Sequence, residues 1–384
     1  MSGRFTFYEF FAGGGMARLG LGERWRCSFA NDICEKKAAS YRANFAPAKE
    51  LLVRDISKVK PFDLPGRAQM AWASFPCQDL SLAGSGAGLD GDRSGTFWPF
   101  WKLLQNLRSE DRAPRVVVLE NVAGALTSHG GEDFAEIFRA LVRVGYRIGP
   151  MVMDAIHFLP QSRPRLFVLA VETEREIPRS LIASSAIKPW HPRAIEDVYT
   201  SFSPYYQQKW IWWGLPPPPN CDISIDDMIE DEPTGVEWHT RDETARLLSH
   251  MSPLNLSKVD QIRGSGKRRV GFVYRRTRPQ ADGQKRQRAE VRFDGISGCL
   301  RTPVGGSSRQ IVLIVERGQL RSRLLSPREA ARLMGLPDTY RLPEKYNEAY
   351  HVAGDGVAVP VVRHLAENLL HPILNPRERL ERAA

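Results

Sequence analysis

The first 171 residues alternate between short β-rich runs and segments with helical spacing, and this alternation constrains the fold more than any other feature. Such alternation is typical of a doubly wound α/β sheet that has helices on both faces. The expected strands are Phe5–Phe10, Trp25–Asn31, Leu51–Asp55, Met70–Phe75, Val116–Glu120, Tyr146–Ala155 and Leu166–Val171. The expected helices between them are Met16–Leu21, Cys34–Asn44 and Phe134–Val144. Because ligands of such sheets bind at the carboxyl ends of the strands, functional residues should directly follow strands.

The character of the chain changes between residues 172 and 298, where we expect a second, smaller and irregular domain. This part contains a tryptophan cluster (Trp210, Trp212 and Trp213), an acidic patch at 226–232 and a basic stretch at 263–292. We expect the tryptophans to be packing core rather than a base-stacking platform. Regular structure should return after residue 298. A capping box that starts at Ser326 opens a helix to about Met334, and Gly356–Leu370 is expected to be a final amphipathic helix.

Composition limits the class of protein. The formal net charge is +10, which favours a polyanionic partner without proving one. The five cysteines are scattered and form no CxxC pair, so we expect neither disulfides nor a metal site. The N-terminus lacks the apolar region of a signal peptide, and no apolar run approaches the roughly 20 residues that span a bilayer. We therefore expect a cytoplasmic protein with reduced thiols and no membrane association.

A glycine-rich turn, Phe11-Ala12-Gly13-Gly14-Gly15, follows the first expected strand. It does not match the dinucleotide fingerprint, because Arg18 occupies the position of the last glycine, and it lacks the Gly-Lys-Ser/Thr of a phosphate-binding loop. Asp32, at the end of the second strand, could hold ribose hydroxyls. A nucleoside site and an ordinary strand–helix turn both remain open on these residues alone.

Three further strand ends carry reactive or charged residues. Cys77 follows the fourth strand in a turn that Pro76 stiffens, and a glycine-rich loop that could close as a lid comes after it. Glu120 ends the fifth strand and could bind the edge of a base. Arg163 and Arg165 precede the last strand and should point the same way, toward phosphates or a carbonyl oxygen. Taken singly, Cys77 could be an inert core cysteine, Glu120 a solvated strand end, and the two arginines an ordinary surface pair.

Taken in order, these motifs resemble the bacterial cytosine-C5 DNA methyltransferase family over about residues 5–171 and 298–370. The motifs are the glycine turn, Pro76-Cys77-Gln78, Glu120-Asn121-Val122, Gln161-Ser162-Arg163-Pro164-Arg165, Arg301-Thr302-Pro303 and Gly354-Asp355-Gly356-Val357. The resemblance implies the S-adenosylmethionine-dependent methyltransferase fold, with a mixed seven-stranded sheet. It implies a catalytic domain in 1–171, a target-recognition domain in 172–298, and a support segment in 299–384 whose last helix returns to the catalytic domain.

The resemblance also implies a mechanism. Cys77 would add to C6 of a flipped-out cytosine, Glu120 would hold N3 and the amino group, and Arg165, helped by Arg163, would contact O2. DNA contacts would come from Gln78, Ser81, Arg93, Arg301 and Thr302. S-adenosylmethionine would be bound by Phe11, Ala12, Gly13, Gly14, Gly15, Asp32, Ile33, Asp55, Ile56, Pro76, Phe97, Asp355 and Val357. The implied partners are double-stranded DNA and, in a restriction–modification system, a cognate endonuclease, and we expect a monomer.

Three positions depart from the family pattern: Glu9 replaces Asp, Met16 replaces Gly, and Asp355 replaces Asn. Three other functions are weighed against DNA methylation. A tRNA cytosine methyltransferase shares the catalytic residues but usually lacks a large insert. A catalytically idle DNA-binding protein would not need Cys77, Glu120, Arg163 and Arg165, and a nicotinamide oxidoreductase would need the missing glycine fingerprint. Which arginines of 263–292 read bases, rather than contact phosphates, stays open at this point.

Overall fold

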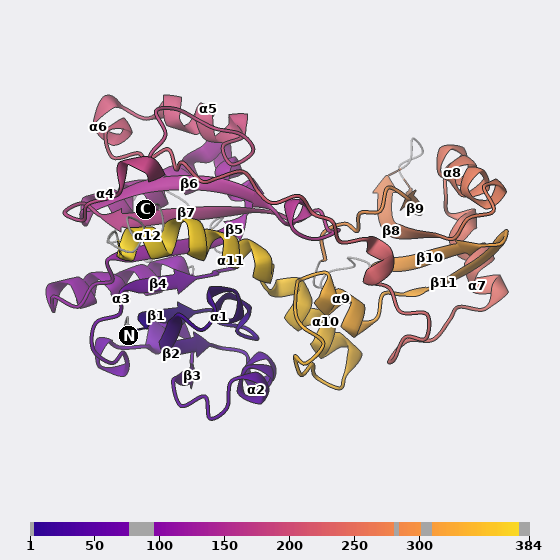
Figure 1. Cartoon of the computed structure of the whole chain (residues 1–384), viewed down its shortest axis with the longest axis horizontal. Coiled ribbons are helices and arrows are strands. Elements are labelled where there is room, and N and C mark those ends of the chain that lie inside the picture. Colours follow the sequence, from indigo (N-terminus) through magenta and orange to yellow (C-terminus); the bar gives the residue numbers. More distant parts are fainter. Residues whose placement is uncertain (1–3, 77–95, 280–283, 301–308, 376–384) are drawn as a thin grey trace, which may run out of the picture. The chain divides into compact units, whose positions relative to one another are not determined.

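The computed structural model describes residues 4–76, 96–279, 284–300 and 309–375. The chain divides into two compact units, drawn in Figure 1. The first unit consists of Met1–Asp154, Pro164–Pro218 and Val359–Ala384, and the second consists of Ala155–Arg163 and Pro219–Ala358. Each unit is therefore built from segments that are far apart in the sequence.

The first unit contains the expected mixed sheet of seven strands, in the order β3-β2-β1-β4-β5-β7-β6. The strands are β1 (Phe5–Phe10), β2 (Trp25–Asp32), β3 (Leu51–Val53), β4 (Met70–Ala73), β5 (Val116–Val122), β6 (Tyr146–Asp154) and β7 (Pro164–Glu172). Neighbouring strands among β1 to β5 pair in parallel, whereas β7 is antiparallel to both β5 and β6. The doubly wound fold expected from the sequence is confirmed.

Helices cover both faces of this sheet because β1 and β2 bury side chains on each face. The helices are α1 (Met16–Leu21), α2 (Glu35–Asn44), α3 (Phe97–Ser109), α4 (Glu132–Arg143), α5 (Arg193–Ser201), α6 (Pro204–Gln207), α11 (Val359–Leu365) and α12 (His371–Leu374). Tyr8 and Phe10 point into a cluster with Phe100 of α3 and Phe138 of α4. On the other face, the Trp25 indole donates to His371 Nε2 of α12 over 2.8 Å.

The C-terminal segment returns to the first unit, but its helices differ from the expected Gly356–Leu370. Helix α10 (Tyr346–Asp355) ends first, and α11 then begins at Val359 and continues through a π-helical turn into α12. Helix α11 packs closely on α1, since a Cβ on Gly20 would lie 2.5 Å from Cβ of Val362. The Arg175 guanidinium donates to the carbonyls of Ile373 and Leu374, which satisfies acceptors that lack an intrahelical partner at the end of α12.

The tryptophan cluster is packing core, as expected, but it belongs to the first unit. Trp210 and Trp213 are buried, and the Trp213 indole donates to the carbonyl of Gly149 over 3.0 Å. Trp210 also forms a single bridge with Ile148 of β6, so the segment after β7 continues the packing of the sheet. The compact units therefore assign 172–218 to the first unit, whereas composition had suggested one continuous insert from 172 to 298.

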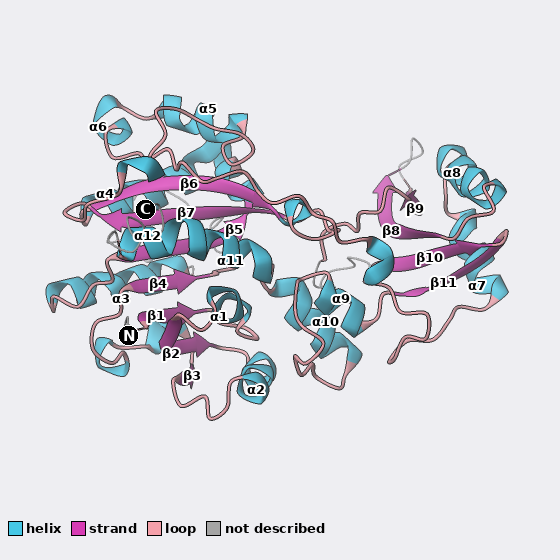
Figure 2. Cartoon of the chain, viewed as in Figure 1, coloured by secondary structure: helices cyan, strands magenta, loops and turns pink. Residues whose placement is uncertain are grey.

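The second unit contains a regular antiparallel sheet in the order β11-β10-β8-β9, shown as magenta arrows in Figure 2. Its strands are β8 (Arg269–Pro279), β9 (Lys285–Arg292), β10 (Ile311–Glu316) and β11 (Gln319–Leu324), and its helices are α7 (Arg241–Ser249), α8 (Pro253–Gly264), α9 (Pro327–Arg332) and α10. The expectation of an irregular domain was wrong, because frequent arginines conceal the alternation of buried residues along β8 and β9.

The capping box at Ser326 is confirmed at the start of α9. The Glu329 amide donates to Ser326 Oγ over 3.1 Å, and the Ser326 amide donates back to Glu329 Oε2 over 2.7 Å. Arg323 donates to both Glu329 oxygens over 2.6 and 2.7 Å, and both side chains are fully buried. This internal ion pair joins the end of β11 to the first turn of α9.

Gly149 offers a test of the packing between β6 and the tryptophan segment. A methyl group there would overlap the Trp213 indole nitrogen and lie 2.5 Å from the carbonyl oxygen of Ile211. We expect Gly149→Ala to lower the free energy of unfolding by about 1–3 kcal/mol, measured by urea denaturation. Gly124→Ala is the matched control, because nothing lies within 4 Å of its Cβ position. Equal stability of the two variants would contradict this account.

Candidate active site

The sequence-predicted residues of the first unit gather at one edge of its sheet. Strands β1, β2, β3, β4 and β5 run parallel, so their carboxyl ends lie at the same edge. The glycine turn follows β1, Asp32 and Ile33 lie at the end of β2, Asp55 follows β3, Pro76 follows β4, and Glu120 lies near the end of β5. The fold therefore brings together residues that are up to about a hundred positions apart in the chain.

Asp32 organises the glycine turn. Its Oδ2 accepts from the Gly13 amide and its Oδ1 accepts from the Cys34 amide, both over 2.8 Å. The turn requires left-handed backbone at Gly13 (φ 54°) and Gly15 (φ 78°), and Cβ on Gly15 would also overlap the Phe45 ring. Since a carboxylate has about four acceptor positions, Asp32 can support this turn and still accept from a ligand.

Two apolar side chains at this edge are open to solvent. Ile33 is 67% exposed, although isoleucine is usually buried. Phe11 is half-buried and adopts an unusual left-handed backbone (φ 57°). Strain of this kind is often concentrated at ligand sites. These features favour a flat apolar ligand group lying beside the glycine turn.

Other residues expected to line this region are less open. Ile56 and Phe97 are 5% and 1% exposed and belong to the hydrophobic cluster under α3. Asp55 accepts from the amide and hydroxyl of Ser57, and these hydrogen bonds hold its pKa below the usual range. Pro76 is exposed at the end of the described segment after β4. Their roles toward a cofactor remain proposals.

Glu120 and Arg165 form an ion pair across β5 and β7. Arg165 Nε lies 3.2 Å from Glu120 Oε1, and both side chains are largely buried. Antiparallel pairing sets Arg165 opposite Val122, two residues from Glu120, so the sheet register places the two charges on the same face. The arrangement presents an acceptor and a multiple donor at one place, which is suited to the polar edge of a planar ring.

Asn121 is a residue whose role was missed in the sequence. Its Nδ2 donates to the Phe75 carbonyl over 3.0 Å, and its Oδ1 accepts from the Val122 amide over 2.8 Å. The side chain thus joins the strand of Glu120 to the segment that leads into Pro76 and Cys77. Its place beside Glu120 in the motif was the only available signal, because the sequence does not show that β4 and β5 are neighbours.

Arg163 lies in the second unit and is only 2% exposed. Its guanidinium donates to the carbonyls of Leu300, Gly354 and Gly356 over 2.7 to 2.9 Å. The fully buried Gln161 nearby donates to the Leu333 carbonyl and accepts from the Leu300 amide. Arg163 therefore joins the main chain at Leu300, directly before Arg301 in the sequence, to the main chain on both sides of Asp355. Asp355 itself is exposed and Val357 is buried.

Several predicted residues lie outside the part of the chain that the structure describes: Cys77, Gln78, Ser81, Arg93, Arg301 and Thr302. Among the described residues, no cluster of His, Cys, Asp and Glu has the composition of a metal site. No helix in the described ranges is long and apolar enough to cross a bilayer.

Glu9 is a buried carboxyl group beneath the glycine turn. It is 1% exposed, its Oε1 accepts from the Arg18 amide over 3.2 Å, and its buried Oε2 has no hydrogen-bond partner among the described residues. Burial raises the pKa of Glu9 to about 8, although the charge of Arg18 partly opposes this shift. The protonated form is therefore the stable one in the folded protein at neutral pH.

Comparison with known proteins identifies the class. The sequence profile described as "C-5 cytosine-specific DNA methylase" matches residues 5–371. Type II methyltransferase M.BsuFI of Bacillus subtilis is 26% identical over 365 residues, which cover 94% of this chain and 72% of the relative. Type II methyltransferase M.Bsp6I of Bacillus sp. (strain RFL6) is also 26% identical, with coverage of 95% and 98%.

Solved structures share the fold. Dnmt2 methyltransferase of S. pombe superposes with a TM-score of 0.58 at 19% identity, covering 97% of this chain and all of that chain. The methyltransferase EhMeth of Entamoeba histolytica gives a TM-score of 0.57 at 14% identity, covering 97% and 99%. The chain belongs to the C-5 cytosine-specific DNA methylase family. It is a sequence-specific DNA cytosine-5 methyltransferase, and the family resemblance found in its motifs is confirmed.

The buried Glu9 predicts a pH dependence of stability. Between its usual pKa of 4.5 and about 8, the unfolded chain releases the proton while the folded chain retains it, so wild-type stability falls as pH rises. We expect Glu9→Gln to remove this penalty. Relative to wild type, the variant should gain roughly 2–4 kcal/mol between pH 4.5 and pH 8, measured by urea unfolding. The exposed Glu35→Gln serves as control, and parallel pH curves for wild type and Glu9→Gln would contradict the assignment.

Proposed function

We propose that this methyltransferase acts by covalent catalysis, with Cys77 as nucleophile and Glu120, Arg165 and Arg163 as its catalytic partners. The observation that carries the proposal is the ion pair between Glu120 of β5 and Arg165 of β7, which are 3.2 Å apart. Asn121, the neighbour of Glu120 on β5, donates to the Phe75 carbonyl. Phe75 is two positions before Cys77 in the sequence. Cys77 would thus follow β4, which is the neighbour of β5 and its base-binding Glu120.

The chemistry follows from the weak nucleophilicity of cytosine C5. The Cys77 thiolate forms a bond to C6, and the electron density released onto C5 allows that carbon to accept a methyl group. Glu120 binds N3 and the exocyclic amino group, and Arg165 donates to O2, so charge on the ring is balanced as the adduct forms. A base that the sequence does not identify, with water as one candidate, then removes the C5 proton, which expels Cys77 and restores the ring. The proposed help from Arg163 rests on its place in the motif, two residues before Arg165 in the sequence.

S-adenosylmethionine is the proposed methyl donor, because it supplies an electrophilic methyl group bound to a sulfonium centre. The exposed Ile33 and half-buried Phe11 would contact the adenine, and Asp32 would hold the ribose hydroxyls. Nothing lies within 4 Å of the Cβ position of Gly13, so this turn leaves room for the methionine part. The remaining proposed contacts come from Ala12, Gly14, Gly15, Asp55, Ile56, Pro76, Phe97, Asp355 and Val357.

The proposed substrate form is double-stranded DNA from which the target cytosine is flipped, because a stacked base cannot reach the nucleophile. Gln78, Ser81, Arg93, Arg301 and Thr302 are the proposed DNA contacts. Target recognition is proposed for the second domain expected at 172–298, of which the part from Pro219 onward belongs to the second compact unit. We also propose a cytoplasmic monomer. Its partner would be a cognate restriction endonuclease if it belongs to a restriction–modification system, and it would have none as an orphan enzyme.

Tritium transfer tests substrate, reaction and nucleophile together. With labelled S-adenosylmethionine and mixed-sequence duplex DNA, we expect wild-type protein to label cytosine C5 and Cys77→Ser to show no transfer above background. The half-buried Cys221→Ser is the matched control and should retain activity. Transfer to tRNA but not to DNA would overturn the proposed substrate, and full activity of Cys77→Ser would overturn the proposed nucleophile.

The departure at Asp355 is expected to leave methyl transfer intact, since every proposed catalytic position is present. Its side chain is exposed, and Arg163 holds the carbonyls on both sides of it. We expect Asp355→Asn to change the dissociation constant of S-adenosylmethionine by no more than about threefold, as for most exposed substitutions. Calorimetric titration measures this constant. Much tighter binding by the variant would show that the acidic side chain weakens the cofactor site.

A further inference from the structure

Asn31 is a buried polar residue near the carboxyl end of β2, directly before Asp32. It is 1% exposed, and its Nδ2 donates to the carbonyls of Leu52 and Arg54 over 3.0 and 2.8 Å. A side-chain amide nitrogen carries two donors, so these two hydrogen bonds use both of them. The side chain therefore reaches from β2 to the end of β3 and to the segment that follows β3.

The main chain of Arg54 is held at both of its polar groups by consecutive residues of β2. Its amide donates to the Asp32 carbonyl over 3.0 Å, and its carbonyl accepts from Asn31. That carbonyl belongs to the peptide group that joins Arg54 to Asp55. Because a peptide group is planar, fixing its carbonyl also fixes the direction in which the chain enters Asp55.

Asn31 and Asp32 join this segment to the glycine turn. The Asn31 carbonyl accepts from the Ala12 amide over 2.9 Å, and the Asp32 carboxylate accepts from the Gly13 amide over 2.8 Å. Two segments that follow different strands are thus aligned through neighbouring residues of β2. Their relative position follows from these shared partners.

The segment after β3 depends on such contacts. β3 is the end strand of the sheet and is three residues long. Further along the chain, Asp63 Oδ2 accepts from Arg54 Nη1 over 3.2 Å and from the Lys60 amide over 2.9 Å. The Arg54 side chain is 39% exposed, so solvent weakens its ion pair with Asp63. The buried amide of Asn31 is therefore the stronger of these two constraints on Arg54.

Asp55 presents a carboxylate oxygen at the end of this constrained segment. Its hydrogen bonds from the amide and hydroxyl of Ser57 both end on Oδ1, over 2.9 and 2.8 Å. Since each carboxylate oxygen is an acceptor, Oδ2 can accept from the amino group of a ligand. An acceptor at a fixed position selects adenine over a purine with a 6-oxo group, because the oxo group cannot donate and repels the carboxylate.

We propose that Asn31 is a positioning residue that sets the selectivity of the cofactor pocket for adenine. By holding the peptide group before Asp55, it keeps the Asp55 carboxylate within reach of the 6-amino group while Asp32 holds the ribose. The inference rests on the proposed function, which takes S-adenosylmethionine as the methyl donor and assigns Asp55 to it. The donors of Asn31 are used by main-chain carbonyls, so this residue acts through Asp55 and not by contact with the cofactor.

Calorimetric titration with two ligands tests the proposal. The ligands are S-adenosylhomocysteine and its inosine counterpart, in which a 6-oxo group replaces the 6-amino group. We expect wild-type protein to bind the adenine ligand about tenfold more tightly or better, as for one hydrogen bond to a charged group. In Asn31→Ala this ratio should fall to about threefold or less, through weaker binding of the adenine ligand. Equal weakening of both ligands is the result of a purely structural defect, and it would overturn the proposal.

Asp63→Ala acts on the same segment from its other side and keeps the test decisive if Asn31→Ala does not fold. It removes the ion pair with Arg54 and the acceptor of the Lys60 amide. The ratio should fall in the same direction but by less, because the Asn31 hydrogen bonds remain. If Asn31→Ala does not fold, a wild-type ratio in folded Asp63→Ala would reject the proposal.

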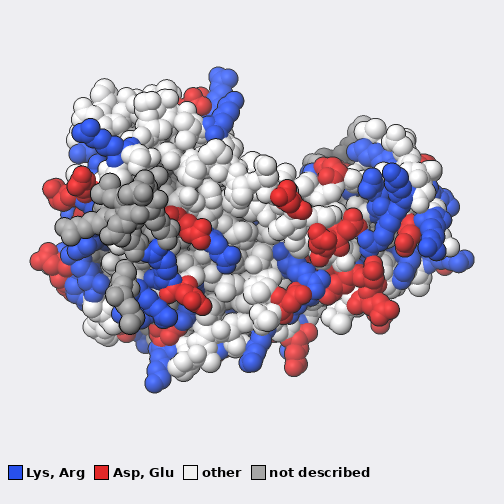
Figure 3. Space-filling model, in the orientation of Figure 1, with Lys and Arg blue, Asp and Glu red and all other residues white. Residues whose placement is uncertain are grey.

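DNA binding separates a local effect from a general one. Asn31 is buried and uncharged, so its replacement leaves unaltered the surface Lys, Arg, Asp and Glu, one face of which Figure 3 shows. The dissociation constant of Asn31→Ala for a labelled duplex without cofactor should therefore stay within about twofold of the wild-type value. A larger loss would mean that the substitution disturbs the protein beyond the cofactor pocket, contrary to the proposal.

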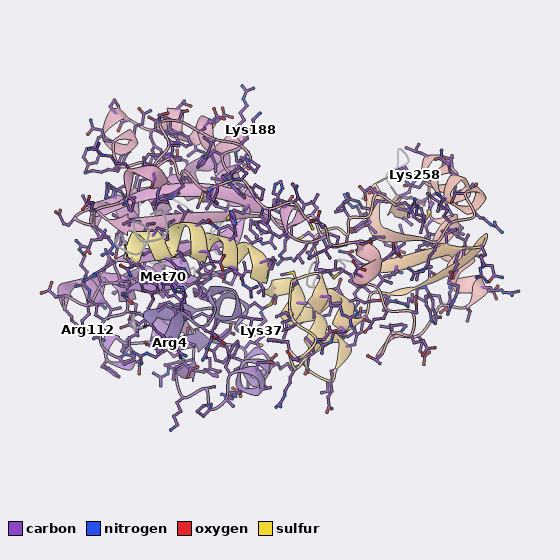
Figure 4. The ribbon with its side chains drawn as sticks, in the orientation of Figure 1. Arg4, Lys37, Met70, Arg112, Lys188 and Lys258 are labelled. Carbon is purple, nitrogen blue, oxygen red and sulfur yellow. The ribbon has the colours of Figure 1, made fainter. Side chains whose placement is uncertain are left out.

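Tyr146→Phe is the matched control at the other edge of the sheet. The buried Tyr146 hydroxyl donates to the Pro114 carbonyl over 2.6 Å, so this variant also loses a hydrogen bond to a main-chain carbonyl. Pro114 follows soon after Arg112, which Figure 4 labels at the end of the first unit away from Lys37 of α2. Thermal unfolding should occur at a lower temperature than in wild type, with the ligand ratio unchanged. A reduced ratio here would show that the effect is not specific to Asn31.

Wild-type binding separates failure of this inference from failure of the proposed function. If wild-type protein binds neither S-adenosylmethionine nor S-adenosylhomocysteine, the proposed cofactor is rejected and the inference with it. If it binds both but does not distinguish the inosine ligand, the inference is rejected and the cofactor stands. If it distinguishes the ligands and Asn31→Ala distinguishes them equally well, Asn31 has no positioning role.

Discussion

The parallel arrangement of β1 to β5 is the constraint on which the candidate site of the first unit depends. Parallel strands place all their carboxyl ends at one edge, so a turn at residue 11, a carboxylate at residue 32 and an ion pair at residue 120 become neighbours of that edge. The antiparallel strand β7 then enters beside β5 from the opposite direction. That reversal brings Arg165 to Glu120, which a further parallel strand would not do.

Buried polar groups determine the packing around this framework. Asp32 holds the glycine turn through two main-chain amides, and Asn121 joins β5 to the segment after β4. In the second unit, Arg163 joins two remote main-chain segments, and Arg323 is paired with Glu329 without solvent contact. Burying such groups costs free energy unless they are bonded, so these hydrogen bonds and this ion pair favour one arrangement of the segments that they join. They thereby hold functional segments at defined positions.

Part of the positive charge of the chain is engaged within the protein. Arg175 donates to a main-chain carbonyl, and Arg268 and Arg323 pair with carboxylates. The formal net charge of +10 nevertheless favours a polyanionic substrate, and DNA is the substrate of this family.

The sequence by itself determined the alternation of strands and helices, the order of the motifs and, through them, the class of enzyme. Strand periodicity and the capping box depend on neighbouring residues only, so these local features were predicted well. Tertiary structure alone decided that the tryptophan segment continues the first unit, that β8–β11 form a regular sheet, and that Asn121 reaches Phe75. It also placed Arg268 and Arg292 beside carboxylates. These outcomes depend on strand order and register between remote segments, and a pattern read along the chain carries no information about which strands become neighbours.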